Sequence, residues 1–260
     1  MKKTIKLFTP PIITQAVHSL KVSTKVEDSQ IERPKIGVSP NLFDNEPNFF
    51  EDEIKKCSVY GEYGTGSSTS FALNHSDVSV ICVDTDPYWL RQATKGFTDS
   101  SRLHAKAIDV GQVLAWGIPV GAARMEQFLE YTDWIWNQEK SPDLVLIDGR
   151  FRVCCFLTTL KHCEPGCLII FDDYVHRPQY HFVERFLPVN EKRGRQALFV
   201  IPKKRLGMKR SSILLSKLFA ATLTDSAASM AIYRVIQKGA FISWLLKSVK
   251  ILAASRPYWR

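Results

Sequence analysis

Residues 57–84 read CSVYGEYGTGSSTSFALNHSDVSVICVD, and they decide the fold. The stretch holds two short apolar runs, at 57–62 and 78–84, with a helix-forming segment at 67–74 between them. A glycine-rich turn follows the first run, and an acid ends the second. Apolar runs that alternate with helical segments are typical of a parallel sheet that is buried on both faces. The stretch therefore predicts a strand–helix–strand unit of an α/β domain.

The same alternation of strand and helix signals continues along the chain. Further strands are predicted at 103–109, 143–148 and 167–172, with an antiparallel hairpin of 188–190 and 196–201 around the turn EKRGR. Helices are predicted at 48–56, 87–94, 126–138, 151–162 and 180–187. The expected fold is a doubly wound, mostly parallel Rossmann-like α/β sheet of about seven strands that ends in an antiparallel hairpin.

The composition is that of a globular protein with a sizeable core. The chain has 260 residues, of which 45% are hydrophobic and 23% are charged, and these values exclude the disordered, collagen-like and disulfide-scaffold classes. No uninterrupted apolar run reaches about 18 residues, so we expect no transmembrane helix. The chain opens with basic residues, but Lys6, Pro10 and Pro11 break the apolar stretch that follows, so it does not resemble a secretory signal. We therefore predict a cytoplasmic protein, with association to a membrane surface left open.

The six cysteines agree with that compartment. They lie at 57, 82, 154, 155, 163 and 167, and they form no CxxC pair. Free cysteines in apolar runs behave as small buried hydrophobic residues, as expected where thiols stay reduced. The alternative is a zinc site, although its ligand spacing matches no known pattern. The candidate ligands of that site would be Cys154, Cys155, His162, Cys163 and Cys167.

The net charge of +9 is concentrated near the C-terminus. Residues 203–260 carry 12 Lys and Arg and a single acid, Asp225, which leaves residues 1–202 with a net charge of −2. A nucleic-acid binder usually spreads its basic residues over the folded body, so nucleic acid is not the expected partner. We expect three parts, namely an N-terminal arm at 1–45, a Rossmann-like domain at 46–202 and a basic, helical extension at 203–260.

The extension carries amphipathic segments with interposed lysines. They predict helices at 211–223, 227–237 and 240–254, with a strand at 230–236 as an alternative. A basic helix with an aromatic residue can lie in a membrane interface. The other options are packing on the domain and a homodimer contact.

Glycines and acids stand at the predicted carboxyl ends of the first two strands. Gly64 and Gly66 would let a ligand approach the backbone, and Asp84 is placed to accept hydrogen bonds from a ribose diol. A dinucleotide loop would have a glycine where Thr69 stands, and this loop has no P-loop lysine for ATP. The pattern therefore predicts a nucleotide-type ligand other than these two.

The E-x-G-x-G pattern at 62–66 resembles motif I of class I S-adenosylmethionine-dependent methyltransferases, and VSVICVDTDPYWL at 78–90 resembles their motif II. The resemblance covers roughly residues 45–201, with Ser68 as a mild departure in the loop. It implies a contact of Glu62 with the amino-acid part of S-adenosylmethionine and of Asp84 with its ribose. The loop residues Gly64, Gly66 and Ser68 would line the cofactor, and Asp109 would lie near the adenine edge.

Three more carboxylates, Asp148, Asp172 and Asp173, end two neighbouring strands and would repel one another if nothing neutralised them. A divalent cation such as Mg²⁺ resolves that repulsion. The arrangement resembles metal-dependent O-methyltransferases of the catechol and the macrocin or antibiotic-sugar type, and it implies that these acids hold the metal and orient the acceptor hydroxyl. The alternative is that Asp172 and Asp173 cap the next helix or pair with Arg177.

The chain departs from that family two residues after the first acid, where Arg150 stands and Arg152 follows. With Asp148 placing the reacting hydroxyl, His176 or His181 would take its proton. Arg150, Arg152 and Arg177 are candidates for binding an anionic group of the substrate, and their alternative is an ion pair with a nearby acid.

The leading hypothesis is a methyltransferase that acts on a hydroxyl of a small molecule or a glycan. One rival is a non-catalytic, methyltransferase-like binding or scaffold protein that its basic extension attaches to a membrane or a partner. A second rival is a nicotinamide-dependent oxidoreductase. Trp116, Trp134 and Trp136 would cover the adenine or a sugar ring, or would belong to the core.

Overall fold

The computed structural model describes residues 41–203 except 98, 100, 114 and 120–123. The chain divides into two units, Met1–Pro34 and Lys35–Arg260, and every described residue belongs to the second. The helices predicted in the basic extension and most of the N-terminal arm lie outside the described residues. Within the described part, no helix is both long and apolar enough to cross a membrane.

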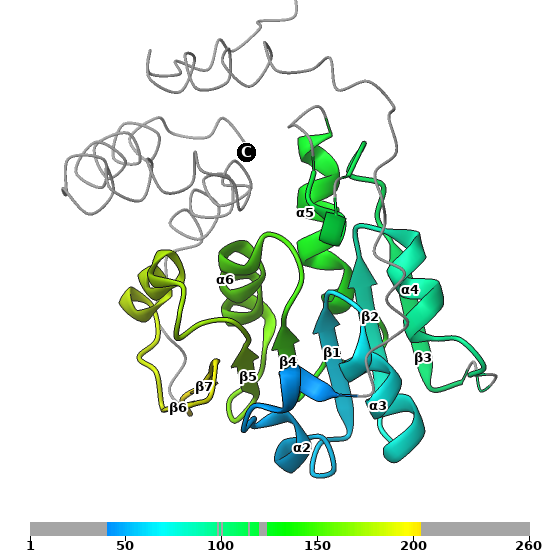
Figure 1. Ribbon diagram of the computed structural model, residues 1–260. Coiled ribbons are helices and arrows are strands. Elements are labelled where there is room, and N and C mark those ends of the chain that lie inside the picture. The colour runs from blue at the N-terminus through cyan, green and yellow to red at the C-terminus, as the bar shows by residue number, and fades with distance from the viewer. Residues whose placement is uncertain (1–40, 98, 100, 114, 120–123, 204–260) are drawn as a thin grey trace, which may run out of the picture. The chain divides into compact units, whose positions relative to one another are not determined.

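The core of the protein is a seven-stranded sheet with the order β3-β2-β1-β4-β5-β7-β6 (Figure 1). The first five strands in the chain run parallel, whereas β7 is antiparallel to β5 and β6 is antiparallel to β7. The strands are β1 (Val59–Tyr63), β2 (Ser79–Asp84), β3 (Leu103–Ala107), β4 (Leu144–Ile147), β5 (Leu168–Phe171), β6 (Glu191–Arg193) and β7 (Gln196–Val200). The prediction of a doubly wound, mostly parallel sheet with a terminal hairpin is confirmed.

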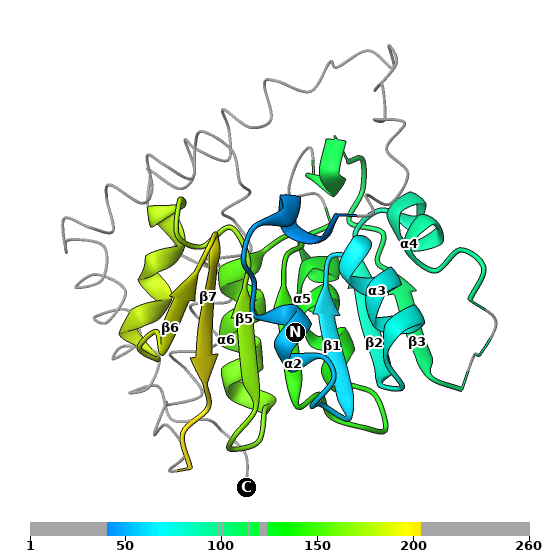
Figure 2. The same ribbon diagram turned by 60° about the horizontal axis from the view of Figure 1, so that its bottom comes forward.

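Helices cover both faces of the sheet. Figure 2 shows α2 (Phe50–Glu53) and α3 (Ser67–His75) on one face, with α5 (Met125–Asp133) and α6 (Arg152–His162) on the other. The short helix α4 (Pro87–Ala93) follows β2. The 3-10 segments are η1 (Leu42–Asn45), η2 (Ala115–Gly117), η3 (Trp134–Trp136) and η4 (Pro178–Arg185).

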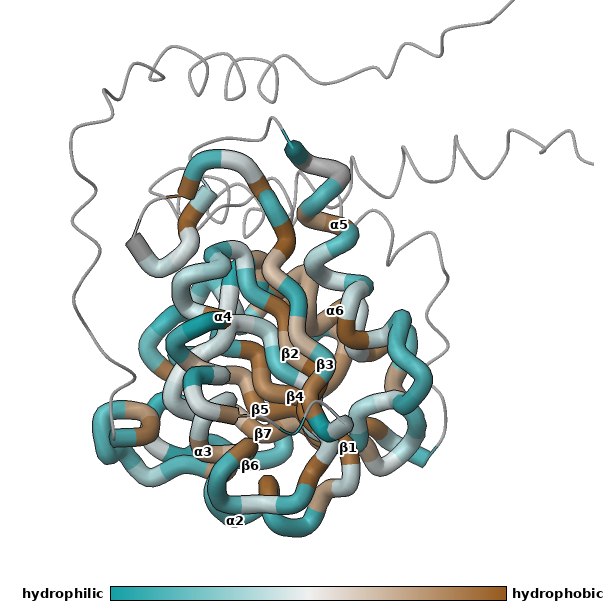
Figure 3. The backbone as a smooth tube through the Cα atoms, turned by 90° about the vertical axis from the view of Figure 1, so that its right-hand side faces the viewer, coloured by the Kyte–Doolittle hydropathy of each residue, from teal (hydrophilic) through white to brown (hydrophobic). Residues whose placement is uncertain are grey.

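The alternation of side chains along each strand builds two hydrophobic layers. Val80 and Cys82 join the layer under α2 and α3, while their neighbours Ile81 and Val83 join the layer under α5 and α6. Successive residues of a strand point to opposite faces, so a run without polar residues fills both layers. Figure 3 accordingly shows the hydrophobic residues concentrated on the central strands. This double burial explains why the apolar runs in the sequence locate the strands.

The C-terminal hairpin differs in detail from the sequence prediction. Strand β6 is formed by Glu191–Arg193, inside the segment predicted as a turn, and 188–190 is not a strand. The connection to β7 is only Gly194 and Arg195, with Gly194 at a φ of 52°. The polar residues of β6 conceal it in the sequence, because an edge strand needs little apolar surface.

The end of the N-terminal arm packs into the domain. Leu42 and Phe43, within the predicted arm of 1–45, are buried in the layer under α2.

The six cysteines are free, and five of them are buried. Among the described residues, the aspartates 148, 172 and 173 form the only group with metal-ligand spacing, so nothing supports the zinc alternative.

Candidate functional site

The strand order reverses at β1, which lies between β2 and β4. In open α/β sheets, ligands bind beyond the carboxyl ends of the strands at such a switch point. The loops after β1, β2 and β4 therefore frame the candidate site. The site residues predicted from the sequence lie in these loops, after β3, and after β5.

Gly64 and Gly149 bring the loops after β1 and β4 into direct contact. Gly64 has a φ of 89°, and a Cβ placed on it would lie 2.4 Å from Cα of Gly149. A Cβ on Gly149 would lie 2.2 Å from the hydroxyl of Tyr131 and 2.6 Å from the Gly64 nitrogen. Both positions exclude a side chain, so Gly64 serves loop packing. The sequence analysis missed Gly149, and its only signal was a glycine directly after Asp148 at the end of the next central strand.

Gly66 differs from Gly64 because its surroundings are open. Its φ of −175° is extended, and nothing lies within 4 Å of a Cβ built there. Its amide donates a hydrogen bond of 3.0 Å to Oγ1 of Thr69 at the start of α3. Gly66 is therefore the point of the loop where a ligand can approach the backbone closely.

Glu62 is fully buried on β1 and faces the first turn of α3. Its carboxylate accepts hydrogen bonds from the hydroxyl of Ser68 and, at 2.5 Å, from Oγ1 of Thr69. Burial raises the pKa of Glu62 to about 7, and these hydroxyl donors partly oppose that shift. Glu62 and Ser68, both predicted to bind the cofactor, are thus brought together. The contact of Glu62 with a cofactor stays a prediction.

Asp84 ends β2 and holds the loop after β1. Its Oδ2 accepts hydrogen bonds from the amide of Thr65 at 2.7 Å and from Oγ1 of Thr65 at 2.9 Å, and its Oδ1 accepts from the amide of Asp86 at 2.8 Å. Burial raises the pKa of Asp84, while the hydrogen bonds from Thr65 and Asp86 oppose the shift. With a further backbone hydrogen bond from Thr85, these donors fix the orientation of the Asp84 carboxylate at the end of β2.

An aromatic surface lies beside Asp84. Gly117 accepts a hydrogen bond of 2.8 Å from Oγ1 of Thr85, and a Cβ on Gly117 would lie 3.7 Å from Oδ1 of Asp84. The preceding Trp116 is 56% exposed. Its ring stacks on Trp89 of α4, with centroids 5.3 Å apart and an interplanar angle of 6°. The outer face of Trp116 is therefore available to a planar ligand next to the acid.

The other two tryptophans considered from the sequence are not available in this way. Trp136 is buried and donates a hydrogen bond of 2.9 Å from Nε1 to the hydroxyl of Tyr63. Trp134 packs against the same layer, and Nζ of Lys106 lies 4.7 Å from the centre of its ring. For this pair, the core alternative holds.

Asp109 follows β3 and is exposed. It accepts a hydrogen bond of 3.0 Å from the amide of Gly111, and it forms an ion pair with Arg124. The hydrogen bond from Gly111 lowers the pKa of Asp109, with Arg124 contributing in the same direction. The predicted contact of Asp109 with adenine stays a prediction.

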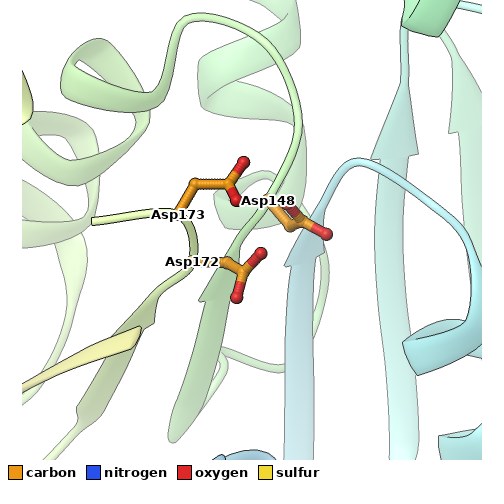
Figure 4. Close-up of side chains that lie close together, drawn as sticks. All are labelled: Asp148, Asp172 and Asp173. Carbon is orange, nitrogen blue, oxygen red and sulfur yellow. The ribbon is translucent and has the colours of Figure 1, made fainter. Parts of the chain in front are cut away.

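The structure brings together the three aspartates predicted at the ends of β4 and β5 (Figure 4). One oxygen of each carboxylate lies within 4.8 Å of the others. Asp172 is fully buried, whereas the side chains of Asp148 and Asp173 are 30% and 20% exposed. We call Asp148, Asp172 and Asp173 the acidic cluster.

Arg152, at the start of α6, is buried in the middle of the acidic cluster. Nε donates to the carbonyl of Gly149 at 3.0 Å, and Nη1 donates to the carbonyl of Asp172 at 2.7 Å. Nη2 donates to the carbonyl of Asp148 at 2.7 Å and to its Oδ1 at 2.9 Å. Nη1 also lies 3.0 Å from Oδ2 of Asp173. A guanidinium has five N–H donors, and here each has an acceptor within the protein.

A second arginine, Arg195, reaches the acidic cluster from the hairpin turn. Its Nε donates to Oδ1 of Asp172 at 3.1 Å, and its Nη2 lies 2.7 Å from Oδ2 of Asp172. Nη1 donates to Asp44 at 2.6 Å on the other side. Gln196 adds a hydrogen bond of 3.1 Å from Nε2 to Oδ1 of Asp172. The sequence analysis missed Arg195, because its partner lies 23 residues away and only the hairpin position brings them together.

The arginines move the pKa values of the cluster in different directions. Burial acts to raise the pKa of Asp173, but Arg152, Arg177 and Arg195 outweigh it and lower the value. Arg177 lies 2.9 Å from Oδ2 of Asp173. Burial and then the negative charge of Asp172 raise the pKa of Asp148, in spite of Arg152. The alternative in which the acids pair with local arginines is therefore seen in the structure.

The predicted proton acceptors, His176 and His181, and the remaining arginine, Arg150, lie in the segments that follow β5 and β4 in the chain. Nε2 of His181 lies 3.0 Å from the carbonyl of Tyr174, and the centroids of the two rings lie 4.7 Å apart with an interplanar angle of 31°. His176 is exposed in the loop after Asp173. The backbone amide of Arg150 donates to the hydroxyl of Tyr131 at 3.3 Å. The contact of these residues with a substrate stays a prediction.

Comparison with known proteins gives matches among solved structures. No family model and no curated protein matches the sequence. A methyltransferase-like protein from Silicibacter pomeroyi is 29% identical, with a TM-score of 0.60, and the match covers 74% of this chain and 99% of that one. The predicted resemblance to class I methyltransferases is confirmed.

Two other structures are more distant. An O-methyltransferase from Bacillus cereus in complex with SAH is 16% identical, covering 75% of this chain and 93% of that one, with a TM-score of 0.39. An N-methyltransferase from Bradyrhizobium japonicum in complex with S-adenosyl-L-homocysteine is 13% identical, covering 72% of this chain and 98% of that one, with a TM-score of 0.39. These likenesses are too weak to assign a reaction or an acceptor.

Proposed function

We propose that this protein is an S-adenosylmethionine-dependent methyltransferase that methylates a hydroxyl of a small molecule or a glycan. The observation that carries the proposal is the opening at Gly66 beside Asp84, at the switch point of the sheet. This arrangement lies in a chain that shares 29% identity with a methyltransferase-like protein, and the match covers 99% of that protein and 74% of this chain. The cofactor supplies, when bound, a methyl group on a positively charged sulfur.

The residues around the opening fit such a cofactor. The backbone at Gly66 admits a ligand, and we assign Asp84, whose carboxylate is oriented at the end of β2, to the ribose hydroxyls. The exposed face of Trp116 offers a stacking surface for adenine beside Asp84. Glu62 on β1 and Ser68 at the start of α3 flank this loop, and we assign them to the support of the cofactor's amino-acid end. Asp109, after the next strand, is assigned to the adenine edge.

Asp148 is the residue of the acidic cluster that we assign to the acceptor hydroxyl. It follows β4 beside the Gly64–Gly149 contact, and Figure 4 shows its carboxylate on the side of the cluster that faces β1. Its Oδ1 is held by Arg152, while Oδ2 accepts no hydrogen bond from the described residues. Asp148 would accept the proton of the acceptor hydroxyl, and a cofactor held at Gly66 and Asp84 would supply the methyl group.

His176 and His181 are the alternative proton acceptors, since both follow the acidic cluster in the chain. Arg150 and Arg177 are the candidates for an anionic group on the acceptor, whereas Arg152 has no donor left for that task. The basic extension at 203–260 is assigned to a homodimer contact or a membrane surface. Truncation after residue 203 would test that assignment through the oligomeric state and through vesicle binding.

Calorimetric titration of the full-length protein with S-adenosylhomocysteine tests the proposal. We expect micromolar binding and a loss of at least tenfold in affinity in Asp84→Ala, because that variant removes the ribose acceptor. Asp77→Asn, an exposed acid before the same strand, is the matched control and should bind as the wild type does. A folded protein that does not bind would favour the scaffold hypothesis, and tighter binding of NADH would favour the oxidoreductase.

A further inference from the structure

We propose that the acidic cluster is neutralised by the protein's own arginines, Arg152, Arg177 and Arg195, and that it takes up no divalent cation. The sequence led us to expect Mg²⁺ at Asp148, Asp172 and Asp173, and the residues present do not fit that ion. The inference about the cluster stands on its geometry alone. Its consequence for catalysis, methyl transfer without a metal, rests on the proposed function.

Every N–H group of Arg152 already has an acceptor within the protein. This buried guanidinium lies between the carboxylates of Asp148 and Asp173 and also satisfies three backbone carbonyls at the ends of β4 and β5. A cation bound between those carboxylates would have to displace it. No free N–H remains, so Arg152 cannot rotate away without leaving several buried acceptors unpaired. Its contacts therefore make it a fixed part of the site.

Arg195 covers the other side of the acidic cluster. Both oxygens of the fully buried Asp172 lie within 3.1 Å of Arg195 nitrogens, and Gln196 donates to one of them as well. Hard cations such as Mg²⁺ require oxygen ligands with open lone pairs, and they keep several waters in their shell. Oδ1 of Asp172 already has two donors. Oδ2 accepts no hydrogen bond, but it lies 2.7 Å from Nη2 of Arg195 in an ion pair, and the complete burial of Asp172 opposes the entry of those waters.

The charges of the acidic cluster are balanced by arginines. Three carboxylates face the guanidinium groups of Arg152, Arg195 and Arg177, so the group is neutral when all of them are ionised. The repulsion that a metal would relieve is thus already relieved. A divalent cation would add two positive charges next to three guanidinium groups, which opposes binding.

The arrangement gives Arg152 a positioning role. It joins the end of β4 to the end of β5 and fixes Oδ1 of Asp148, which leaves Oδ2 as the oxygen that a ligand can reach. The acceptor is therefore placed by a hydrogen bond to Asp148 and does not need two neighbouring oxygens to chelate a metal. Acceptors with a single isolated hydroxyl are compatible with this site.

Titration of the full-length protein with Mn²⁺, followed by calorimetry and by electron paramagnetic resonance, tests the inference. We expect no stoichiometric binding by the wild type, and no shift of its melting temperature with Mg²⁺ or Ca²⁺. Arg195→Met should acquire Mn²⁺ binding at least tenfold tighter than the wild type, because it uncovers Asp172. Arg193→Met is the matched control, since Arg193 lies in the same hairpin but pairs with Asp52, and it should acquire none.

Arg152→Met should also acquire cation binding. If Arg152→Met does not fold, Arg195→Met still decides the test, because Arg195 is partly exposed and its replacement should be tolerated. Stoichiometric Mn²⁺ binding by the wild type that Asp148→Asn removes would overturn the inference. So would an Arg195→Met variant that is folded and still binds no cation. S-adenosylhomocysteine binding, measured on the same samples without added metal, shows separately whether the proposed function fails.

Discussion

Two halves of the site hold buried carboxylates by different means. On the side of β1 and β2, Glu62 and Asp84 accept hydrogen bonds from hydroxyls and backbone amides, and the pKa values of both are raised by burial. On the side of β4 and β5, guanidinium groups surround the acidic cluster, and the pKa of Asp173 is lowered. Burial disfavours the charged form of an acid, while a nearby cation favours it.

The two halves differ in the ligands that they can accept. A half without fixed cations can accept a ligand that is itself cationic, such as a sulfonium cofactor. In the half that contains the arginines, the carboxylate of Asp173 is held ionised, and the pKa of Asp148 is raised by burial and by the charge of Asp172. Gly64 and Gly149 join the two halves, so a substitution there should disturb both of them.

Gly64→Ala should give the largest effect. The added Cβ would meet the Gly149 backbone at 2.4 Å and would require a residue with a side chain to adopt a φ of 89°. Overpacking and the left-handed conformation together should lower the free energy of unfolding by about 3 kcal/mol. Urea unfolding followed by circular dichroism would measure this loss.

Gly66→Ala is the control for that substitution, since nothing lies within 4 Å of its Cβ. It should cost less than about 1 kcal/mol in stability while weakening S-adenosylhomocysteine binding. Equal losses of stability in the two variants would contradict the separate roles assigned to the glycines.

Glu62→Gln should change the pH dependence of stability. The pKa of Glu62 is about 7 in the folded protein and close to 4.3 when unfolded, so between these values the folded state binds more protons. Its contribution to stability is therefore full below the unfolded pKa and is lost as pH rises towards 7. The variant should remove this decline and should exceed the wild type by roughly 3–4 kcal/mol above pH 7.

Urea midpoints at several pH values would reveal the difference between Glu62→Gln and the wild type. Asp84→Asn is the comparison variant, because its backbone donors oppose the burial shift. Parallel pH profiles for Glu62→Gln and the wild type would show that Glu62 does not carry a raised pKa.

Trp116→Ala should have the smallest effect and should act on binding alone. Its exposed ring contributes little to the core, so the melting temperature should stay within a degree or two of the wild type. Loss of one stacking face should weaken S-adenosylhomocysteine binding by roughly fivefold. Trp136→Phe is the matched control, since it removes a buried hydrogen bond and should lower stability with no change in affinity. Unchanged affinity in Trp116→Ala together with weaker binding in Trp136→Phe would place the ligand away from Trp116.

The sheet could be predicted because its signals are local. The runs at 78–84 and 143–148 are apolar at successive positions, as strands buried on both faces must be, and parallel topology then puts Asp84 and Asp148 at one edge. Strand β6 was misplaced because an edge strand of three polar residues carries no such signal.

The α/β fold, the glycine-rich loop and the meeting of three aspartates follow from residue pattern and strand direction, and so could be predicted. What neutralises those aspartates depends on how distant elements pack together. That outcome depends on Arg152 entering the cluster from the first turn of α6 and on Arg195 arriving from a two-residue hairpin turn. The same residue types at the same spacing would suit a metal if either arginine pointed to solvent, and side-chain direction is set by packing between elements that are distant in sequence.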